Sequence, residues 1–228
     1  MDNRLTRVLV YAAITGAVLL SMTACDWWGS RKHNDVSYGV SQSVKTLVVQ
    51  GETGDITVVG GGDAVTVTEH QHYQDQQPVT THQVSADGTL TLAYHCHDCG
   101  VGYDIHVPAG TVVKLTASTG DVDLSGLTAD VQADTETGKI RATGLTGGKA
   151  ELRAQTGDVC ASFAGAPRAV NASTETGSVQ ITVPGGTGYT VAAAAQTGSV
   201  KVAVPQDPST GRTINAHAET GSVAVTGA

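Results

Sequence analysis

The sequence has few aromatic and few charged residues. Of its 228 residues, 4% are aromatic and 15% are charged, and phenylalanine occurs once. This composition offers little material for a bulky core or for long helices. The formal net charge is −8, with no lysine or arginine cluster beyond the first few residues, which argues against nucleic acid as a partner. The chain does have 28 glycines among many Thr, Val, Ala and Ser residues, which favours short β-strands separated by glycine turns.

The first 24 residues have the pattern of an export signal. Arg4 and Arg7 precede an apolar run from Val8 to Leu20, which is shorter than the ~20 residues that span a bilayer. The following Met22-Thr23-Ala24-Cys25 resembles a bacterial lipobox, with Met where Leu is usual. The resemblance implies that residues 1–24 are removed as a lipoprotein signal peptide and that Cys25 is diacylated. Ordinary signal cleavage, or an uncleaved anchor, is the alternative.

This interpretation predicts where the protein resides. Residues 25–42 become a lipidated tether, and the protein is extracytoplasmic, with its lipid in the bacterial cell membrane.

A repeat dominates the rest of the chain. The string Thr-Gly-x-[Val/Ile] occurs seven times after the signal segment, and from Gly120 onward its spacing is 18, 19, 20, 21 and 23 residues. The glycines are Gly54, Gly120, Gly138, Gly157, Gly177, Gly198 and Gly221. Apolar residues lie at every second position on both sides of each glycine, which is the period of a β-strand with one buried face.

Stacking of such units predicts the fold class. One unit buries too little apolar surface to be stable alone, whereas stacked units share a continuous core. The inward residues are mostly Ala and Val, too small for an ordinary β-sandwich. We therefore predict an all-β, single-chain β-solenoid of about 20-residue coils with Thr-Gly turns. Its regular repeats cover residues 111–228, and residues 43–110 form an irregular N-terminal β region that caps the stack.

Two sequence features resemble a known family. They are Tyr103-Asp104-Ile105-His106-Val107-Pro108-Ala109-Gly110 and the following LTASTGDVDLSGL with its recurrent TG-D/S-V units. Both are similar to the DUF4097, or "putative adhesin", family, and the likeness covers roughly residues 43–227. It implies a β-solenoid on exported or membrane-tethered bacterial proteins, and it brings no catalytic residues.

The segment His95-Cys96-His97-Asp98-Cys99 is the one place where metal or redox chemistry is plausible by residue type. Histidine and cysteine are usual ligands of zinc and copper. Outside the cytoplasm a Cys96–Cys99 disulfide is the simpler interpretation, and it leaves Cys160 unpaired; alternatively, Cys160 pairs with Cys96 or Cys99. On a strand, Cys160 points outward. These alternatives remain open at the level of sequence.

The sequence shows no pattern of an enzyme. It lacks a nucleophile elbow, a paired His/Asp context and a phosphate loop, so we expect no catalysis and no cofactor. Asp55, Asp121 and Asp158 each follow a Thr-Gly pair, and we interpret them as turn residues, not as a calcium column.

The favoured function is that of a non-catalytic surface lipoprotein, acting as an adhesin-like interaction or scaffold module. The alternative is an extracytoplasmic metal-binding or redox-sensing lipoprotein that uses residues 95–99. The expected partners are the membrane, through the N-terminal lipid, and a protein or cell-wall component. The chain ends in AETGSVAVTGA without a polar cap, so we also expect self-association through an open C-terminal coil.

Overall fold

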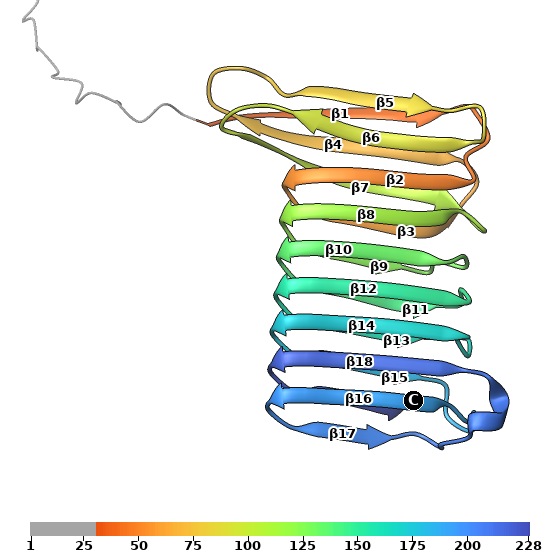
Figure 1. Cartoon of the computed structure of the whole chain (residues 1–228). Helices are drawn as coiled ribbons and strands as arrows, with labels where there is room; N and C mark the ends of the chain where they lie inside the picture. The colour runs from red at the N-terminus through yellow and green to blue at the C-terminus, as the bar shows by residue number, and fades with distance from the viewer. Residues whose placement is uncertain (1–30) are drawn as a thin grey trace, which may run out of the picture.

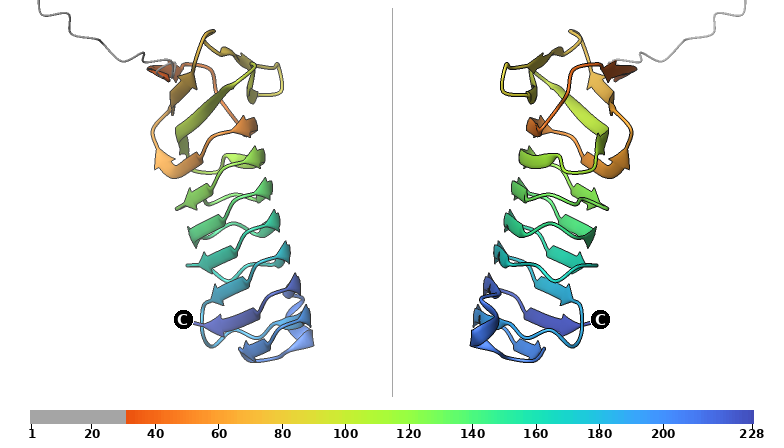
Figure 2. Two further views of the ribbon diagram at one scale, coloured as in Figure 1. Left: turned by 90° about the vertical axis from the view of Figure 1, so that its left-hand side faces the viewer. Right: turned by 90° about the vertical axis from the view of Figure 1, so that its right-hand side faces the viewer.

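A computed structural model describes residues 31–228, and these form two long β-sheets stacked face to face (Figure 1). The lipobox, Cys25 and the first part of the predicted tether lie outside the described residues. Viewed from either side, the chain winds back and forth between the two sheets (Figure 2). In the described part, no helix is long and apolar enough to cross a membrane. The prediction of an all-β chain with stacked coils is confirmed at this level.

The strands follow one another in a definite order in each sheet. The ten-stranded sheet consists, in spatial order, of β1 (Lys32–Val40), β4 (Val65–Tyr73), β7 (Cys99–Pro108), β3 (Ile56–Gly62), β9 (Val122–Ser125), β11 (Ile140–Leu145), β13 (Val159–Phe163), β15 (Val179–Val183), β19 (Val223–Gly227) and β17 (Val200–Ala203). The nine-stranded sheet consists of β16 (Thr190–Thr197), β18 (Thr213–Thr220), β14 (Ala169–Thr176), β12 (Lys149–Thr156), β10 (Val131–Thr137), β8 (Val112–Thr119), β2 (Thr46–Thr53), β6 (Thr89–His95) and β5 (Val79–Val84).

The repeat sets the register between coils. Equivalent residues of successive units pair in parallel, so that Val131 lies between Val113 and Ala150 in one sheet, and Ile140 lies between Val122 and Val159 in the other. Apart from a shift in β11 between Ala142 and Leu145, these units align without an offset, and their inward side chains form continuous apolar columns. Val113, Val122, Ala133, Ile140 and Val159 are fully buried. The thin core therefore follows directly from the alternation of small apolar residues.

Glycine is required at each Thr-Gly corner for two reasons. Gly138 and Gly157 have φ values of 148° and 144°, which an L side chain rarely adopts. A Cβ atom at Gly157 would also lie 1.9 Å from the carbonyl oxygen of Gly138 in the neighbouring coil. The corners of adjacent coils thus approach each other too closely for any side chain.

The N-terminal part adds antiparallel strands to the parallel stack. The coil of β2 and β3 packs directly on β8 and β9, with Leu47 opposite Val113, although the two residues are 66 positions apart in sequence. The intervening chain forms β4 to β7, and β1–β4, β4–β7 and β5–β6 are antiparallel pairs.

The C-terminal coils do not stack in chain order, which corrects the expectation from sequence. The last coil, β18–β19, lies between β14–β15 and β16–β17. Its inward residue Ile214 is fully buried, and the 3₁₀ helix Pro208–Thr210 lies in the loop that leads back to it. The open end of the stack is therefore the coil of residues 190–203, and not the C-terminal residues 213–227.

Candidate functional site at the open end of the stack

The coil of residues 190–203, which we call the end coil, has a strand edge free in both sheets. Within residues 31–228, β16 pairs with β18 and β17 with β19, and neither pairs with another strand on its outer side. Only the beginning of the outer edge of β16 is covered, because Tyr189 forms a bridge to Gln206 and the Gln206 side chain accepts a hydrogen bond from Val191 N–H. The opposite edges of these two strands face away from the stack (Figure 1). Such edges present backbone N–H and C=O groups that can add another β-strand.

Apolar side chains surround these free edges. Val200 and Val202 are 45% and 37% exposed, although their register partners Val223 and Val225 are buried. On β16, Val191 is only partly buried, whereas its partner Ile214 is completely covered. The end coil therefore leaves the end of the apolar core incompletely covered.

The end coil carries little to discourage pairing. Natural edge strands are commonly protected by lysine, proline, bulges or inward charges. β16 reads TVAAAAQT and has no charged residue, and β17 reads VKVA with Lys201 alone. Lys201 occupies an outward position of its strand, because the inward positions are those of Val200 and Val202. A single outward lysine gives these two strands little protection against pairing with another strand.

The opposite end of the stack is closed by polar groups. The edge strands there are β1 and β5, and the Tyr38 ring of β1 stacks on the His82 ring of β5 with centroids 4.5 Å apart. The Tyr38 hydroxyl donates a hydrogen bond of 2.8 Å to Glu69, a carboxylate that is only 1% exposed. Gln71 Nε2 donates a second hydrogen bond, of 3.0 Å, to the Glu69 carboxylate. Burial and the bond to Glu69 raise the pKa of Tyr38 far above its ordinary value, so Tyr38 remains a donor.

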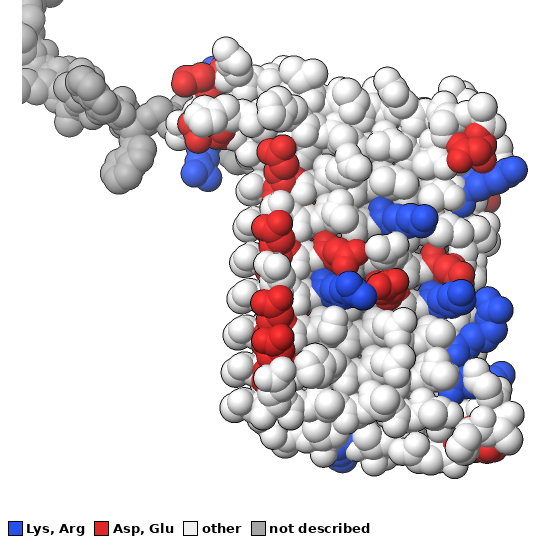
Figure 3. Space-filling model, viewed as in Figure 1, with Lys and Arg blue, Asp and Glu red and all other residues white. Residues whose placement is uncertain are grey.

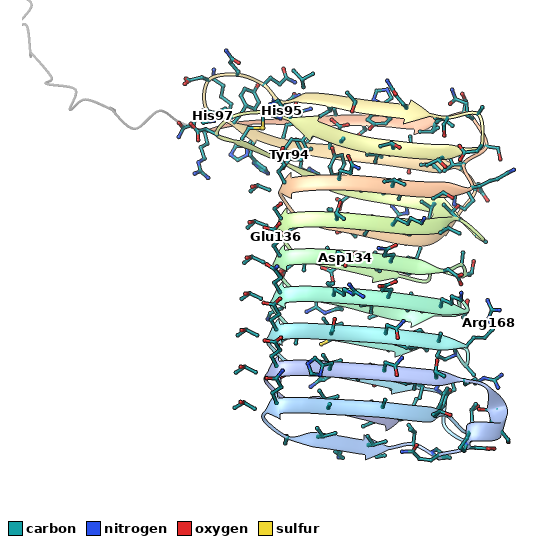
Figure 4. All side chains as sticks on the ribbon, viewed as in Figure 1. Tyr94, His95, His97, Asp134, Glu136 and Arg168 are labelled. Carbon is teal, nitrogen blue, oxygen red and sulfur yellow. A yellow bond between two sulfur atoms is a disulfide. The ribbon has the colours of Figure 1, made fainter. Side chains whose placement is uncertain are left out.

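The segment 95–99 is arranged as a stapled turn. Cys96 and Cys99 form a disulfide with their Cα atoms 5.9 Å apart, at the same end of the stack as β1 (Figure 4). Oxidised sulfurs are not thiolate ligands, so the segment offers no sulfur donors to a metal. His95 and His97 are almost fully exposed, and their nearest acidic groups are Glu52 at 3.8 Å and Asp98 at 3.4 Å.

Cys160 lies far along the stack on β13 and is a free thiol. It is outward and half-buried, as the alternation predicts, and burial together with Asp158 raises its pKa. Within residues 31–228, no group of three or more His, Cys, Asp and Glu side chains is arranged to hold a metal. The metal interpretation of residues 95–99 therefore has no support from the geometry.

The aspartates after the Thr-Gly corners link neighbouring coils. The Asp55 carboxylate accepts a hydrogen bond of 2.8 Å from the backbone N–H of Asp121, and Asp121 accepts one of 2.8 Å from Lys139. Asp158 accepts one of 2.9 Å from Ser178. These carboxylates satisfy backbone donors of the next coil, which is the turn role expected from sequence.

An acidic groove runs along the outer face of the nine-stranded sheet. It has a volume of about 550 Å³, and Figure 3 shows a column of acidic side chains near one edge of this face. Its charged and titratable lining residues are Asp134, Glu136, Arg153, Glu175, His217 and Glu219. Asp134 and Glu136 point outward from β10 (Figure 4). Neutral Gln155 separates Glu136 from Glu175 along the column, which limits the repulsion between like charges.

Sequence reasoning missed one cluster altogether. His33 lies opposite His72 and Asp35 lies opposite His70 on the antiparallel pair β1–β4. The two ring nitrogens of His70 contact Asp35 at 2.9 Å and Asp104 at 3.0 Å, and these bonds raise the His70 pKa. The signal available in the sequence was the spacing of His70 and His72 by two residues, but nothing local indicated that β1 would bring His33 beside them.

Two solved structures share this architecture at low sequence identity. A "putative cell adhesion protein" from Clostridium sporogenes ATCC 15579 is 12% identical, with a TM-score of 0.53, and the match covers 87% of this chain and 100% of the other. A "putative adhesin" from Bacteroides fragilis NCTC 9343 is 18% identical, with a TM-score of 0.50, and the match covers 88% and 99%. At these identities the likeness shows the fold alone.

Sequence comparison identifies the family. No curated protein matches this sequence. The profile of the family described as toastrack DUF4097 matches residues 36–226, which is most of the chain and includes every strand except the beginning of β1 and the end of β19. The resemblance found in the sequence is thereby confirmed, and the chain belongs to the toastrack DUF4097 family.

Proposed function

We propose that this protein is a non-catalytic, lipid-anchored interaction module of the bacterial cell envelope, and that it binds through its end coil. The observation that carries the proposal is the uncapped edge of β16 and β17, with Val200 and Val202 exposed beside it. The names of the two structural neighbours, which refer to adhesion, are in keeping with it.

The position of the predicted lipid orients the stack. Cys25 is seven residues before Lys32, the first residue of β1, so an extended tether spans at most about 25 Å. The end with β1 and the disulfide would then face the membrane. The open end is nine strand spacings away in the ten-stranded sheet, which is about 43 Å. An anchored molecule would thus point its free strand edges away from its own membrane.

The partner we propose for the end coil is a second copy of the chain. The end presents two strand edges at once, one from each sheet, with the apolar core between them. A single extended peptide covers only one edge, whereas another open end covers both. A two-fold axis perpendicular to the sheets would pair β16 with β16 and β17 with β17 in antiparallel fashion, and would continue both sheets. Such head-to-head pairing would join two membrane surfaces.

Sedimentation of the purified protein tests the pairing. We expect a dimer for the natural sequence and a monomer for V202K, because an inward lysine at the edge of the core opposes strand addition. The matched control is Q180K, which adds the same charge on the outward face of the internal strand β15. A monomer at every soluble concentration, or a V202K protein that dimerises like Q180K, would exclude pairing through the end coil.

Labelling of cells with a radioactive fatty acid, followed by fractionation, tests the anchor separately. The natural protein should incorporate the label and partition into detergent with the membrane, and C25S should incorporate none. Retention of C25S in the membrane would indicate an uncleaved signal segment as the anchor instead. This result would leave the pairing of end coils as a separate question.

A further inference from the structure

Four polar side chains cluster on the outer face of the antiparallel strands β1 and β4. The register pairs His33 with His72 and Asp35 with His70. Alternation along each strand places all four on the same face, opposite the buried Glu69 and Gln71. This face belongs to the membrane-proximal end in the orientation proposed above, but the cluster itself is independent of that orientation.

The two histidines of the first pair point their ring nitrogens at each other. The Nδ1 atoms of His33 and His72 are 2.5 Å apart, with the ring centroids at 4.6 Å and the ring planes at 84°. Two unprotonated nitrogens at this separation would repel each other, and a shared proton or a bound cation would relieve the repulsion. The rings meet edge to face, and both exposed Nδ1 atoms lie close enough together to bind a single ion.

The surroundings leave space and favour a cation. The residues opposite His72 and His70 on β7 are Gly100 and Gly102, which have no side chains to fill this face. A hollow of about 560 Å³ adjoins them and is lined in part by His72, Asp55 and Asp104. The carboxylates of Asp104 and Asp35 hold His70 from two sides, and the three groups together keep a net negative charge close to the histidine pair even when His70 is protonated.

We propose that His33 and His72 form an open two-histidine site for a divalent first-row transition metal, copper(II) in preference to others. Imidazole nitrogen is a usual ligand for copper, nickel and zinc, and copper(II) heads the affinity order. With metal–nitrogen bonds of about 2.0 Å, adjacent ligands of a square-planar ion lie about 2.8 Å apart, against about 3.3 Å in a tetrahedral zinc site. At 2.5 Å the two Nδ1 atoms are close enough to become adjacent ligands in either geometry, and the preference for copper(II) rests on the affinity order. Water or a small anion in the hollow would complete the coordination.

The test is titration of the exported chain with copper(II), purified without a polyhistidine tag, in a buffer whose glycine competes for loosely bound copper. We expect one copper(II) per chain and nitrogen hyperfine splitting in its electron paramagnetic resonance spectrum. Changes in residues around metal ligands already cost about 10–100-fold in affinity, so H33A and H72A should each weaken binding at least tenfold. Both histidines are exposed, and the melting temperature without metal should therefore be unchanged.

The matched control is the double variant H95A/H97A, which removes two exposed histidines from the same end of the molecule. It should bind copper(II) like the natural chain. The proposal is overturned if H33A and H72A retain the natural affinity and spectrum, or if copper binding is lost in H95A/H97A. It is also overturned if the natural chain takes up no stoichiometric copper(II) in the glycine buffer.

Discussion

The two ends of the stack are built on opposite principles. At the N-terminal end the strands run antiparallel, and the core is closed by Tyr38, His82 and the buried Glu69 with its hydrogen-bond donors. At the other end the parallel coils simply stop at β16 and β17, with Val200 and Val202 exposed. One end therefore uses specific polar contacts to protect its edge, and the other leaves its edge available.

This contrast shows that a repeat architecture does not by itself determine how the stack ends. Every regular coil offers strand edges on which another coil can stack, so a structural element outside the repeat has to cover the last coil if the stack is to be closed. The N-terminal region supplies such an element. At the C-terminal side the chain instead turns back and inserts β18–β19 into the stack, which leaves an ordinary coil outermost.

The largest effect is expected from the corner glycines, which both ends share. G157A, in the middle of the stack, adds a Cβ atom 1.9 Å from a backbone oxygen, and it does so at a residue whose φ is 144°. We expect this substitution to lower the free energy of unfolding by about 4 kcal/mol or more. G186A is the matched control, since its φ is also positive but nothing lies within 4 Å of the added atom, and it should cost about 1–2 kcal/mol. Urea unfolding followed by circular dichroism measures both.

A glycine-to-alanine substitution at the corner of the end coil distinguishes unfolding of that coil from unfolding of the whole stack. G198A places its Cβ 2.0 Å from the oxygen of Gly221, but only the end coil depends on that corner. We expect the end coil to detach and dimerisation to be lost, while the main unfolding transition stays near that of the natural chain. Equal destabilisation by G157A and G198A would show that the stack is one cooperative unit up to its edge.

An intermediate effect is expected at the polar end. Y38F removes a hydrogen bond to the buried Glu69 carboxylate and should cost about 1.5–3 kcal/mol, because hydrogen bonds to buried charges are the strong ones. Y73F, on the neighbouring strand β4, removes a hydroxyl that has no side-chain hydrogen-bond partner among residues 31–228, so it should have almost no effect. Thermal melts of the two variants provide the comparison, and equal losses would contradict the role of Glu69.

A smaller effect is expected from the disulfide at that end. C96S/C99S opens a loop of only four residues, and loop-closure entropy then predicts a loss of at most about 2 kcal/mol. The melting temperature should fall, whereas dimerisation through the end coil should be unaffected. Loss of dimerisation in this variant would link the two ends and weaken their contrast.

The smallest effect is a change of rate at Cys160, which lies between the ends. Burial raises the pKa of its thiol, so less thiolate is present at a given pH, and alkylation by iodoacetamide should be slower in the folded chain than in urea. G198A should leave this protection intact, since β13 is distant from the end coil, while G157A should remove it. Mass spectrometry of timed samples reports both, and equal rates in the folded and unfolded chain would contradict the burial.

Much of the core was predictable from the sequence, and much of the candidate sites was not. The alternation around Gly120 to Gly177 predicted the buried residues and their register, because each coil is local in sequence and contacts its neighbours in the same way. The outward position of Cys160 followed from the same rule. The pairing of Cys96 with Cys99 was one of several open alternatives. The pairing of His33 with His72 was missed, since it depends on an antiparallel contact across 39 residues.

By itself, the sequence determined the strand period, the glycine corners and the small apolar core, because these depend on backbone sterics and on residues a few positions apart. Only the tertiary structure decided the order of the last coils. Val191 of β16 and Ile214 of β18 occupy the same position in the repeat as Val170 of β14. The repeat pattern therefore cannot decide which of the two strands pairs with β14. The order depends on which coil gains more by burying its apolar residues between two neighbouring coils. Ile214 has a larger side chain than Val191, and it is fully buried in the inner coil, whereas the end coil remains exposed.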